Sequence, residues 1–297
     1  MKRRTLISSG LSGLLCTLGQ RAFSKGRKTA LTTAAVHHQE ALFHFAVAGD
    51  VGTGKRGQYD VAGAMVQRWQ SSSYFLTLLL GDNIYENGEI EKIQAVFERP
   101  YASLLQREVQ FRAVLGNHDV RIRQGSEEMA YARYNMPSRY YTFTQPSVQF
   151  FALDTNKIYR DARQQTFWQA QLRWLKTELA RSQAQWKVVF AHHPIYSSGR
   201  HGFNRELADD LSPIFAEYGV QLYINGHDHH YERTHPINGT TYITSGNGAK
   251  LRRVGHSDWT AFASSRLGFT TFSIQRDRIL VSAIDTHNAI YDQAFIV

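Results

Sequence analysis

The chain has 297 residues, 42% of them hydrophobic, which is enough to bury one sizeable core. Its formal net charge of +9 lies mostly in residues 1–28, which hold seven Lys and Arg and no acid, so that +2 remains on the rest. A nearly neutral remainder without a basic, aromatic-interleaved stripe argues against a nucleic-acid partner. The only cysteine, Cys16, lies in the same leader, which excludes disulfides and thiolate metal ligands once that leader is removed.

Residues 1–28 have the composition of an export signal. Basic residues at the start are followed by an apolar stretch from Leu6 to Leu18 and then by small residues. The stretch is too short and too weakly apolar to span a bilayer, and no later segment is long enough. The pair Arg3-Arg4 is typical of a twin-arginine signal, although other export signals also begin with basic residues. We therefore expect a periplasmic or secreted protein without stable membrane insertion.

The rest of the chain is predicted to be a polar linker at 29–41 and a single domain at 42–297. Short runs of β-branched and aromatic residues, each bounded by Gly, Asp or Asn, favour buried strands. They lie at 43–50, 74–82, 109–119, 148–155, 186–194 and 220–229. Helical patterns lie between them at 59–70, 90–106, 163–182 and 204–218. Strands that alternate with helices predict an α/β domain with helices packed on a sheet.

The C-terminal part has a different pattern. Residues 240–246 and 268–297 lack helical periodicity and are predicted to form several antiparallel strands. We expect these strands to make a second, antiparallel-rich sheet that packs on the first.

Five of the six predicted strands in the first part end in a polar cluster. The clusters are Gly49-Asp50, Gly81-Asp82, Gly116-Asn117-His118-Asp119, His192-His193 and Gly226-His227-Asp228-His229. Ligands of α/β sheets bind at the carboxyl ends of the strands, and glycine allows the tight turns that project a side chain from a strand end. One Gly-Asp pair is usually an ordinary turn, but five successive clusters of oxygen and imidazole donors predict a metal site.

These blocks, together with Asn83-Ile84-Tyr85, resemble those of the calcineurin-like metallophosphoesterases. The match runs from about Phe43 to at least Tyr231. More narrowly, the chain resembles the purple acid phosphatases of the small tartrate-resistant type, since Asp50-Val51-Gly52 replaces the usual Asp-x-His and Tyr85 follows Asp82 by three residues. The resemblance implies two mixed β-sheets packed face to face with helices outside, a four-layer α/β/β/α sandwich.

The resemblance also implies a binuclear metal centre. The predicted ligands of Fe³⁺ are Asp50, Tyr85, His229 and the shared Asp82. Those of a divalent ion, Fe²⁺, Zn²⁺ or Mn²⁺, are Asn117, His192, His227 and the same Asp82. A phenolate is a hard anionic donor that suits a ferric ion, whereas the alternative for Tyr85 is simple packing at the base of a loop. The two ions would neutralise phosphate oxygens and supply a metal-bound hydroxide as the nucleophile.

Other polar residues near these blocks are given lesser roles. His118 and His201 match second-sphere histidines of the family and are predicted to bind substrate and act as general acids, although His201 is also compatible with a solvent-exposed loop residue. Asp119 is expected to orient His118 by a hydrogen bond. His193 is expected to be a pocket wall. His230 is expected to lie on the surface or in a loop. Lys250, Arg252 and Arg253 could attract phosphate electrostatically, although three basic residues in a loop are usually only solvated.

The predicted function is therefore that of an exported acid phosphatase acting on small phosphate monoesters. Two alternatives remain open: a phosphodiesterase or nucleotide hydrolase on the same scaffold, and a catalytically silent phosphate-binding or adhesion protein. The walls of the pocket, and not its metals, separate monoesterase from diesterase activity, and the sequence leaves the oligomeric state undetermined.

Overall fold

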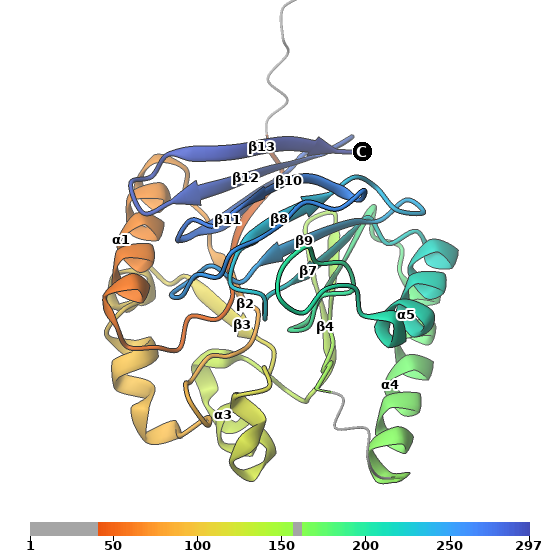
Figure 1. Cartoon of the computed structure of the whole chain (residues 1–297), viewed down its shortest axis with the longest axis horizontal. Helices are drawn as coiled ribbons and strands as arrows, with labels where there is room; N and C mark the ends of the chain where they lie inside the picture. The colour runs from red at the N-terminus through yellow and green to blue at the C-terminus, as the bar shows by residue number, and fades with distance from the viewer. Residues whose placement is uncertain (1–40, 157–161) are drawn as a thin grey trace, which may run out of the picture. The chain divides into compact units, whose positions relative to one another are not determined.

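Both β-sheets combine parallel with antiparallel strands (Figure 1). The computed structural model describes residues 41–156 and 162–297, so the predicted export signal, Cys16 and all but the last residue of the predicted linker lie outside the described residues. The strand order of the first sheet is β13 (Ile290–Ile296), β12 (Ile279–Asp285), β11 (Gly268–Ile274), β1 (Phe43–Ala48), β2 (Leu76–Leu79) and β3 (Gln110–Ala113). That of the second is β10 (Thr260–Ser264), β8 (Tyr231–Thr234), β9 (Thr241–Ser245), β7 (Leu222–Asn225), β6 (Trp186–Phe190), β5 (Val148–Ala152) and β4 (Tyr141–Gln145).

The six strands predicted in the first part of the domain are all present. Strands β1, β2 and β3 run parallel in the first sheet. Strands β5, β6 and β7 run parallel in the second, and β9 extends that parallel set. Within each sheet, the carboxyl ends of these strands therefore lie at one edge.

The prediction that residues 240–246 and 268–297 form a second, separate antiparallel sheet is wrong. Strands β11, β12 and β13 form an antiparallel meander, but β11 pairs with β1 and thereby enlarges the first sheet. Strand β9 joins the second sheet instead, and β8 pairs with it in the antiparallel sense. The physical reason is that β1 and β7 each have an edge not taken by their parallel neighbours. Those edges are paired because unpaired backbone N–H and C=O groups are costly in a buried sheet.

Aromatic and aliphatic side chains fill the space between the two sheets. The ring of Phe45 on β1 meets that of Phe150 on β5 edge to face, with 5.1 Å between centroids, and stacks on Phe272 of β11 at 4.6 Å. All three side chains are fully buried. Burying a phenylalanine side chain stabilises a fold by about 2 kcal/mol, so this contact between β1 and β5 is a substantial part of what holds the sheets together.

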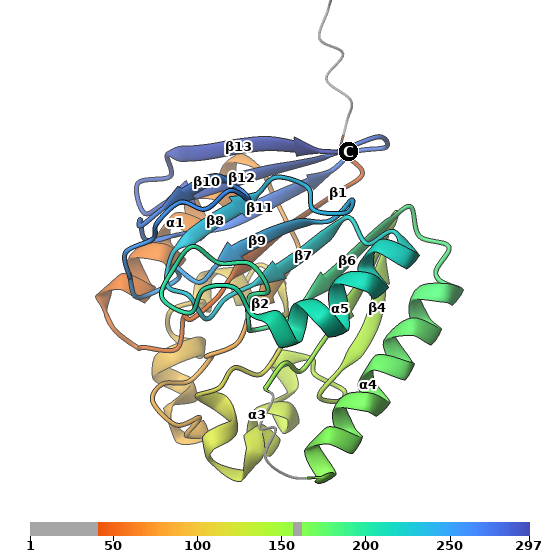
Figure 2. The same ribbon diagram turned by 45° about the vertical axis from the view of Figure 1, so that its right-hand side comes forward.

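Helices cover the outer faces of both sheets (Figures 1 and 2). Helix α1 (Arg56–Ser71) packs on the first sheet through buried Val61 and Met65. Helices α4 (Ala162–Arg181) and α5 (Arg205–Tyr218) cover the second sheet, where Leu175 and Phe215 join one hydrophobic cluster with strand residues. The predicted fold class, two mixed sheets face to face with helices outside, is confirmed.

Three of the four predicted helices are present as α1, α4 and α5, but the one predicted at 90–106 is wrong. That segment is divided into a 3₁₀ turn (Ile90–Lys92), a π turn (Gln94–Glu98) and the short helix α2 (Ala102–Leu105). Pro100 lacks the N–H that a continuous helix requires, and its ring clashes with the preceding turn. The patterns also leave several short elements unpredicted: β4, β8, β10 and α3 (Ser126–Ala130).

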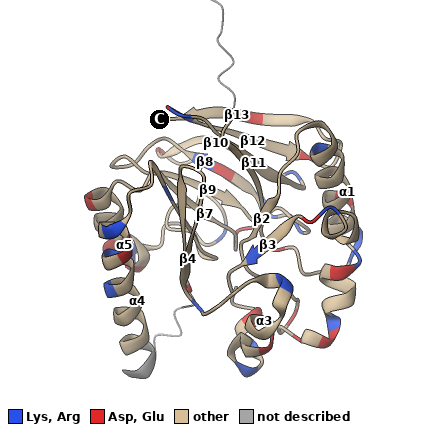
Figure 3. Ribbon diagram, turned by 180° about the vertical axis from the view of Figure 1, so that it is seen from behind, with Lys and Arg blue, Asp and Glu red and all other residues tan. Residues whose placement is uncertain are grey.

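The outer helices carry charges of both signs (Figure 3). In the part of the chain that the structure describes, no helix is both long and apolar enough to cross a membrane.

Candidate metal centre

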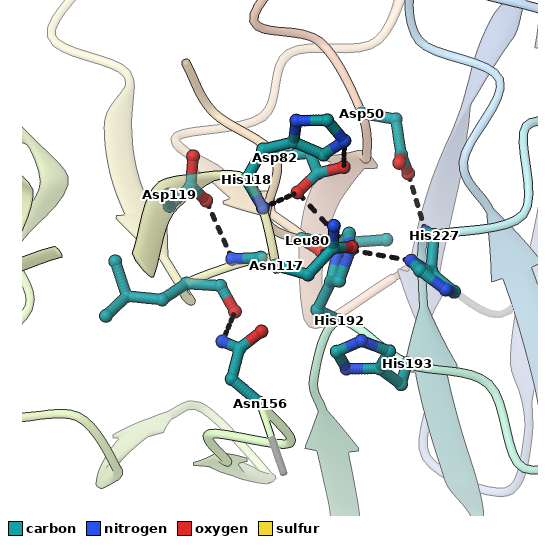
Figure 4. Close-up of polar contacts among 12 residues, drawn as sticks. Asp50, Leu80, Asp82, Asn117, His118, Asp119, Asn156, His192, His193 and His227 are labelled. Atoms are coloured by element: carbon teal, nitrogen blue, oxygen red, sulfur yellow. Dashed lines mark hydrogen bonds and ion pairs between the residues drawn. The ribbon is translucent and has the colours of Figure 1, made fainter. Parts of the chain in front are cut away.

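The seven predicted metal ligands lie together, on the loops that leave the carboxyl ends of parallel strands. Asp50 follows β1, Asp82 and Tyr85 follow β2, and Asn117 follows β3 in the first sheet. His192 follows β6, while His227 and His229 follow β7 in the second sheet. Figure 4 shows five of these side chains pointing toward one another, which means that the centre draws its donors from both sheets.

Three of the seven form what we call the Tyr85 cluster: Asp50, Tyr85 and His229. Tyr85 Oη lies 3.1 Å from Asp50 Oδ1 and 3.3 Å from His229 Nε2. The remaining distance, between His229 Nε2 and Asp50 Oδ1, is also 3.3 Å. All three side chains are buried, so two oxygen donors and one nitrogen donor surround a common point away from solvent.

A second group, the His192 cluster, contains Asn117, His192 and His227. His192 Nε2 lies 3.1 Å from Asn117 Oδ1 and 3.1 Å from His227 Nδ1. The other ring nitrogen of His192, Nδ1, donates a hydrogen bond of 2.8 Å to the carbonyl oxygen of Leu80. Because a carbonyl only accepts, this bond fixes the tautomer and leaves the Nε2 lone pair directed into the cluster.

Asp82 links the two clusters. Its Oδ1 lies 3.4 Å from His192 Nε2, and the same oxygen accepts a hydrogen bond of 3.0 Å from the backbone N–H of His118. Donor atoms of Asp50, Asp82 and His192 all lie within 4.8 Å of one another. Asp82 therefore lies where a carboxylate shared by two ions is expected.

Three of the predicted ligands have a left-handed backbone. The φ angles of Asp50, Asp82 and His227 are 59°, 52° and 68°. This conformation costs a non-glycine residue on the order of 1 kcal/mol, and such strain is characteristic of functional sites. It turns the chain sharply at the strand end, so that each side chain projects at once toward the centre.

Close backbone packing brings the ligand loops together. A Cβ atom on Gly116 would lie 2.2 Å from the backbone nitrogen of Asp82, and one on Gly81, whose φ is +86°, would lie 2.6 Å from His192 Nδ1. The expectation that glycine is needed beside these ligands is therefore confirmed at both positions.

The electrostatics of the metal-free centre oppose charge on Asp50, Tyr85 and His227. In contrast, although burial opposes it, His192 and the backbone N–H of His118 lower the pKa of Asp82. Burial raises the pKa of Asp50 to about 7, with a further contribution from Asp82. Burial, and then the two carboxylates, also raise the pKa of Tyr85, while burial and neighbouring imidazoles lower the pKa of His227. Neutral imidazoles and closely spaced acidic oxygens at one buried point fit the donor set of bound cations, which remove this penalty.

His118 lies at the rim of the centre, but not in the arrangement that was expected. Its Nδ1 donates a hydrogen bond of 2.5 Å to the carbonyl oxygen of Glu86, and its Nε2 lies 3.9 Å from Asp82 Oδ2. The expectation that Asp119 orients this ring is wrong. Asp119 instead accepts hydrogen bonds from the backbone N–H groups of Gly116 (2.7 Å) and Ile84 (3.0 Å), and so it ties the loops after β2 and β3 together.

His201 reaches the centre from the loop before α5. Its ring stacks on that of His227 at 4.0 Å, and its Nδ1 donates a hydrogen bond of 2.7 Å to Asp228 Oδ1. The sequence assigned no role to Asp228, which orients His201; its position between two predicted ligands is the signal that was available.

Two further histidines differ in how well they were predicted. His193 lines the centre, since its ring lies 4.4 Å from that of His227 and its Nδ1 lies 3.0 Å from Thr155 Oγ1, as expected of a pocket wall. The surface position expected for His230 is wrong. That ring is fully buried, with Nε2 3.3 Å from Glu232 Oε2.

Comparison with known proteins agrees with this geometry. Residues 43–231 match the family model of the calcineurin-like phosphoesterases. The chain belongs to this family. Among its relatives, purple acid phosphatase 17 of Arabidopsis thaliana is 30% identical over 286 residues, which cover 84% of this chain and 82% of the relative. Tartrate-resistant acid phosphatase type 5 of Mus musculus is 32% identical over 194 residues, 57% of this chain and 59% of the relative.

Solved structures of other proteins share the fold. The structure described as GAP50, the anchor in the inner membrane complex of Plasmodium, superposes with a TM-score of 0.77 at 21% identity over 86% of this chain and 89% of the other. Purple acid phosphatase PPD1 from yellow lupin (Lupinus luteus) seeds gives 0.72 at 18% identity over 87% of this chain and 54% of the other. At these identities the match concerns the fold alone. The chain spans about 60% of the length of the mammalian relatives.

The purple acid phosphatase relatives imply a binuclear metal centre.

Proposed function

We propose that the protein is an exported acid phosphatase that hydrolyses phosphate monoesters of small molecules at a binuclear metal centre. The observation that carries the proposal is the pair of adjacent donor clusters with Asp82 between them. The acid phosphatase names of the relatives support the same activity. Export rests on the composition of residues 1–28.

The donor chemistry favours different ions in the two clusters. Fe³⁺ suits the Tyr85 cluster with Asp82, because carboxylate and phenolate oxygens are hard anionic donors. Fe²⁺, Zn²⁺ or Mn²⁺ suits the His192 cluster with Asp82, where imidazole nitrogen and an amide oxygen dominate. When bound, two such cations neutralise phosphate oxygens and lower the pKa of water.

The residues at the rim are placed to bind and protonate the ester. Because His118 Nδ1 donates to the carbonyl oxygen of Glu86, its Nε2 is directed toward the centre, where the doubly protonated ring would donate a hydrogen bond to a phosphate oxygen. His201 is held by Asp228 over the His192 cluster. Although burial opposes it, hydrogen bonds from His201 and Ser197 lower the pKa of Asp228 to about 2. A carboxylate at this position keeps a proton on His201 Nδ1 and fixes the orientation of the ring, as the positioning of a general acid requires.

Substrate rates and one variant test the proposal. We expect the metal-loaded protein to hydrolyse a phosphate monoester faster than a diester or ATP. Asp82→Ala should lose more than about 100-fold in kcat with an unchanged circular dichroism spectrum, since the loss of a mere hydrogen-bond partner of a metal ligand already costs about 10–100-fold. A higher rate on the diester or on ATP would favour the nucleotide or diester alternative. A folded, metal-loaded protein without turnover on any ester would favour the silent binding protein.

A further inference from the structure

Lys250 lies against the ring of Tyr85. In the loop between β9 and β10, its Nζ is 3.5 Å from the centroid of the Tyr85 ring and 3.3 Å from Glu86 Oε1. Its side chain is 33% exposed, so the expectation that Lys250 is merely a solvated loop residue is wrong. A lysine ammonium at this distance over an aromatic face is attracted by the electrons of the ring, and the attraction grows as the ammonium loses contact with water.

The backbone of the loop fixes Lys250 in this place. The N–H of Arg252 donates a hydrogen bond of 2.8 Å to the carbonyl oxygen of His229, another member of the Tyr85 cluster. The carbonyl oxygen of Arg252 accepts a hydrogen bond from Ser265 Oγ at 2.6 Å. The loop is thus attached both to the cluster and to the segment that follows β10, and Lys250 is presented to Tyr85 by a defined backbone.

Lys250 contacts the face of the Tyr85 ring and not its hydroxyl group. The Oη atom faces Asp50 and His229. His118 contacts the ring at 4.7 Å in an edge-on arrangement. The ammonium of Lys250 contacts the carboxylate of Glu86 on one side and the ring of Tyr85 on another. Lys250 thus already has an anionic and an aromatic partner, unlike a solvated surface lysine.

We propose that Lys250 is a positioning residue that adjusts the electron density of the Tyr85 phenolate, an inference that rests on the Fe³⁺ assignment made under the proposed function. A cation over a ring attracts a phenolate more strongly than a phenol, because the phenolate is richer in electrons. The ammonium therefore lowers the energy of the ring electrons. Its positive charge also disfavours the more highly charged oxidation state of iron, since net charge and surrounding contacts set such potentials.

Two measurable quantities follow from this contact. The violet colour of an iron–tyrosinate protein arises when light moves an electron from the phenolate to Fe³⁺, so lower-lying ring electrons require light of shorter wavelength. Because the ammonium lies directly over the ring, 3.5 Å from its centroid, it lowers the energy of the ring electrons more than that of the accepting ion. Removing the lysine charge should therefore move the violet band to longer wavelength. It should also lower the Fe³⁺/Fe²⁺ reduction potential.

The experiment compares four iron-loaded proteins of equal iron content: the wild type, Lys250→Met, Lys250→Arg and Arg253→Met. Methionine keeps the length of the side chain and removes its charge, whereas arginine keeps a cation able to lie over the ring. Arg253 is exposed on the same loop, so Arg253→Met removes one charge and serves as the matched control. We expect a longer-wavelength band and a lower potential in Lys250→Met alone.

The outcomes separate this inference from the function on which it rests. A violet wild type whose band and potential are the same in Lys250→Met as in Arg253→Met would overturn the role of Lys250 and leave the phosphatase proposal standing. An iron-loaded wild type without a violet band would overturn the Fe³⁺–Tyr85 assignment, and this inference with it. Lys250→Gln provides a second neutral variant should the methionine protein fail to fold.

Discussion

At the scale of single residues, the centre depends on partners that a sequence pattern does not reveal. Asp228 lies between His227 and His229 in the chain, yet its carboxylate contacts His201 and Ser197 instead of joining the ligand clusters. The positions of the predicted ligands could be anticipated because all seven lie in loops that follow five strands, and the family resemblance implied the full set. The roles of Asp228 and Lys250 depend on contacts between distant segments, in the case of Lys250 and Glu86 across 164 residues.

A pH dependence of stability follows from Asp228. Hydrogen bonds to its carboxylate hold the pKa in the folded protein at about 2, below the ordinary value of 3.8, despite the opposing effect of burial. A group whose pKa is lowered by folding stabilises the folded state at pH values above its pKa in the unfolded chain. That stabilisation is lost as the pH falls through its pKa in the folded protein. Asp228→Asn should therefore lower the free energy of unfolding of the metal-free protein by about 2 kcal/mol at pH 7.

The measurement is urea unfolding of the wild type and Asp228→Asn at several pH values. The difference between them should stay constant from pH 7 to pH 5 and shrink below about pH 4. Asp258→Asn, at an exposed position, is the control and should match the wild type throughout. A difference for Asp228→Asn that persists unchanged at the lowest pH would mean that lost packing, and not the carboxylate charge, causes the destabilisation.

At the scale of elements, the local signals predicted strands better than their partners. The six strands of the first part were found because apolar runs, and the terminal Gly or Asp of most of them, are features of neighbouring residues. The pairing of β11 with β1 brings together segments from opposite ends of the domain, and no local pattern encodes it. The short strand β8 was missed because its four residues follow a ligand block and are too few to show alternation.

The contact between the loops after β2 and β3 gives a prediction at this scale. Gly116→Ala would place a Cβ atom 2.2 Å from the backbone nitrogen of Asp82. Because backbone atoms cannot move aside cheaply, we expect a loss of roughly 3 kcal/mol in the free energy of unfolding and weaker metal binding, as the Asp82 loop is displaced.

Gly63 of α1 offers a matched control. It lies inside the helix, with no atom within 4 Å of an added Cβ. Gly63→Ala should therefore stabilise the protein by about 0.5–1 kcal/mol, through the higher helix propensity of alanine, and leave metal binding unchanged. Urea unfolding and metal titration of both variants test the contrast, and equal effects on metal binding at the two positions would contradict the tight contact at Gly116.

At the scale of the domain, the metal centre joins the two sheets. Asp50, Asp82 and Asn117 come from loops of the first sheet, whereas His192 and His227 come from the second. The sheets also meet through the hydrophobic core. Ions held by both sets of ligands would bind only when the sheets are correctly packed. A ligand that binds only the folded state stabilises it by an amount that grows with its concentration.

Unfolding in the presence of metal should therefore show this linkage. With Fe³⁺ and Zn²⁺ at 100 times their dissociation constants, each ion should add about 2.7 kcal/mol to the free energy of unfolding. Chelation should reverse the gain. Asp82→Ala removes the carboxylate shared by both clusters and should abolish most of the increase, while Asp60→Ala, on the outer surface of α1, should retain it. An equal metal-dependent gain in Asp82→Ala and Asp60→Ala would show that the ions bind elsewhere, because no other predicted ligand lies between the two clusters.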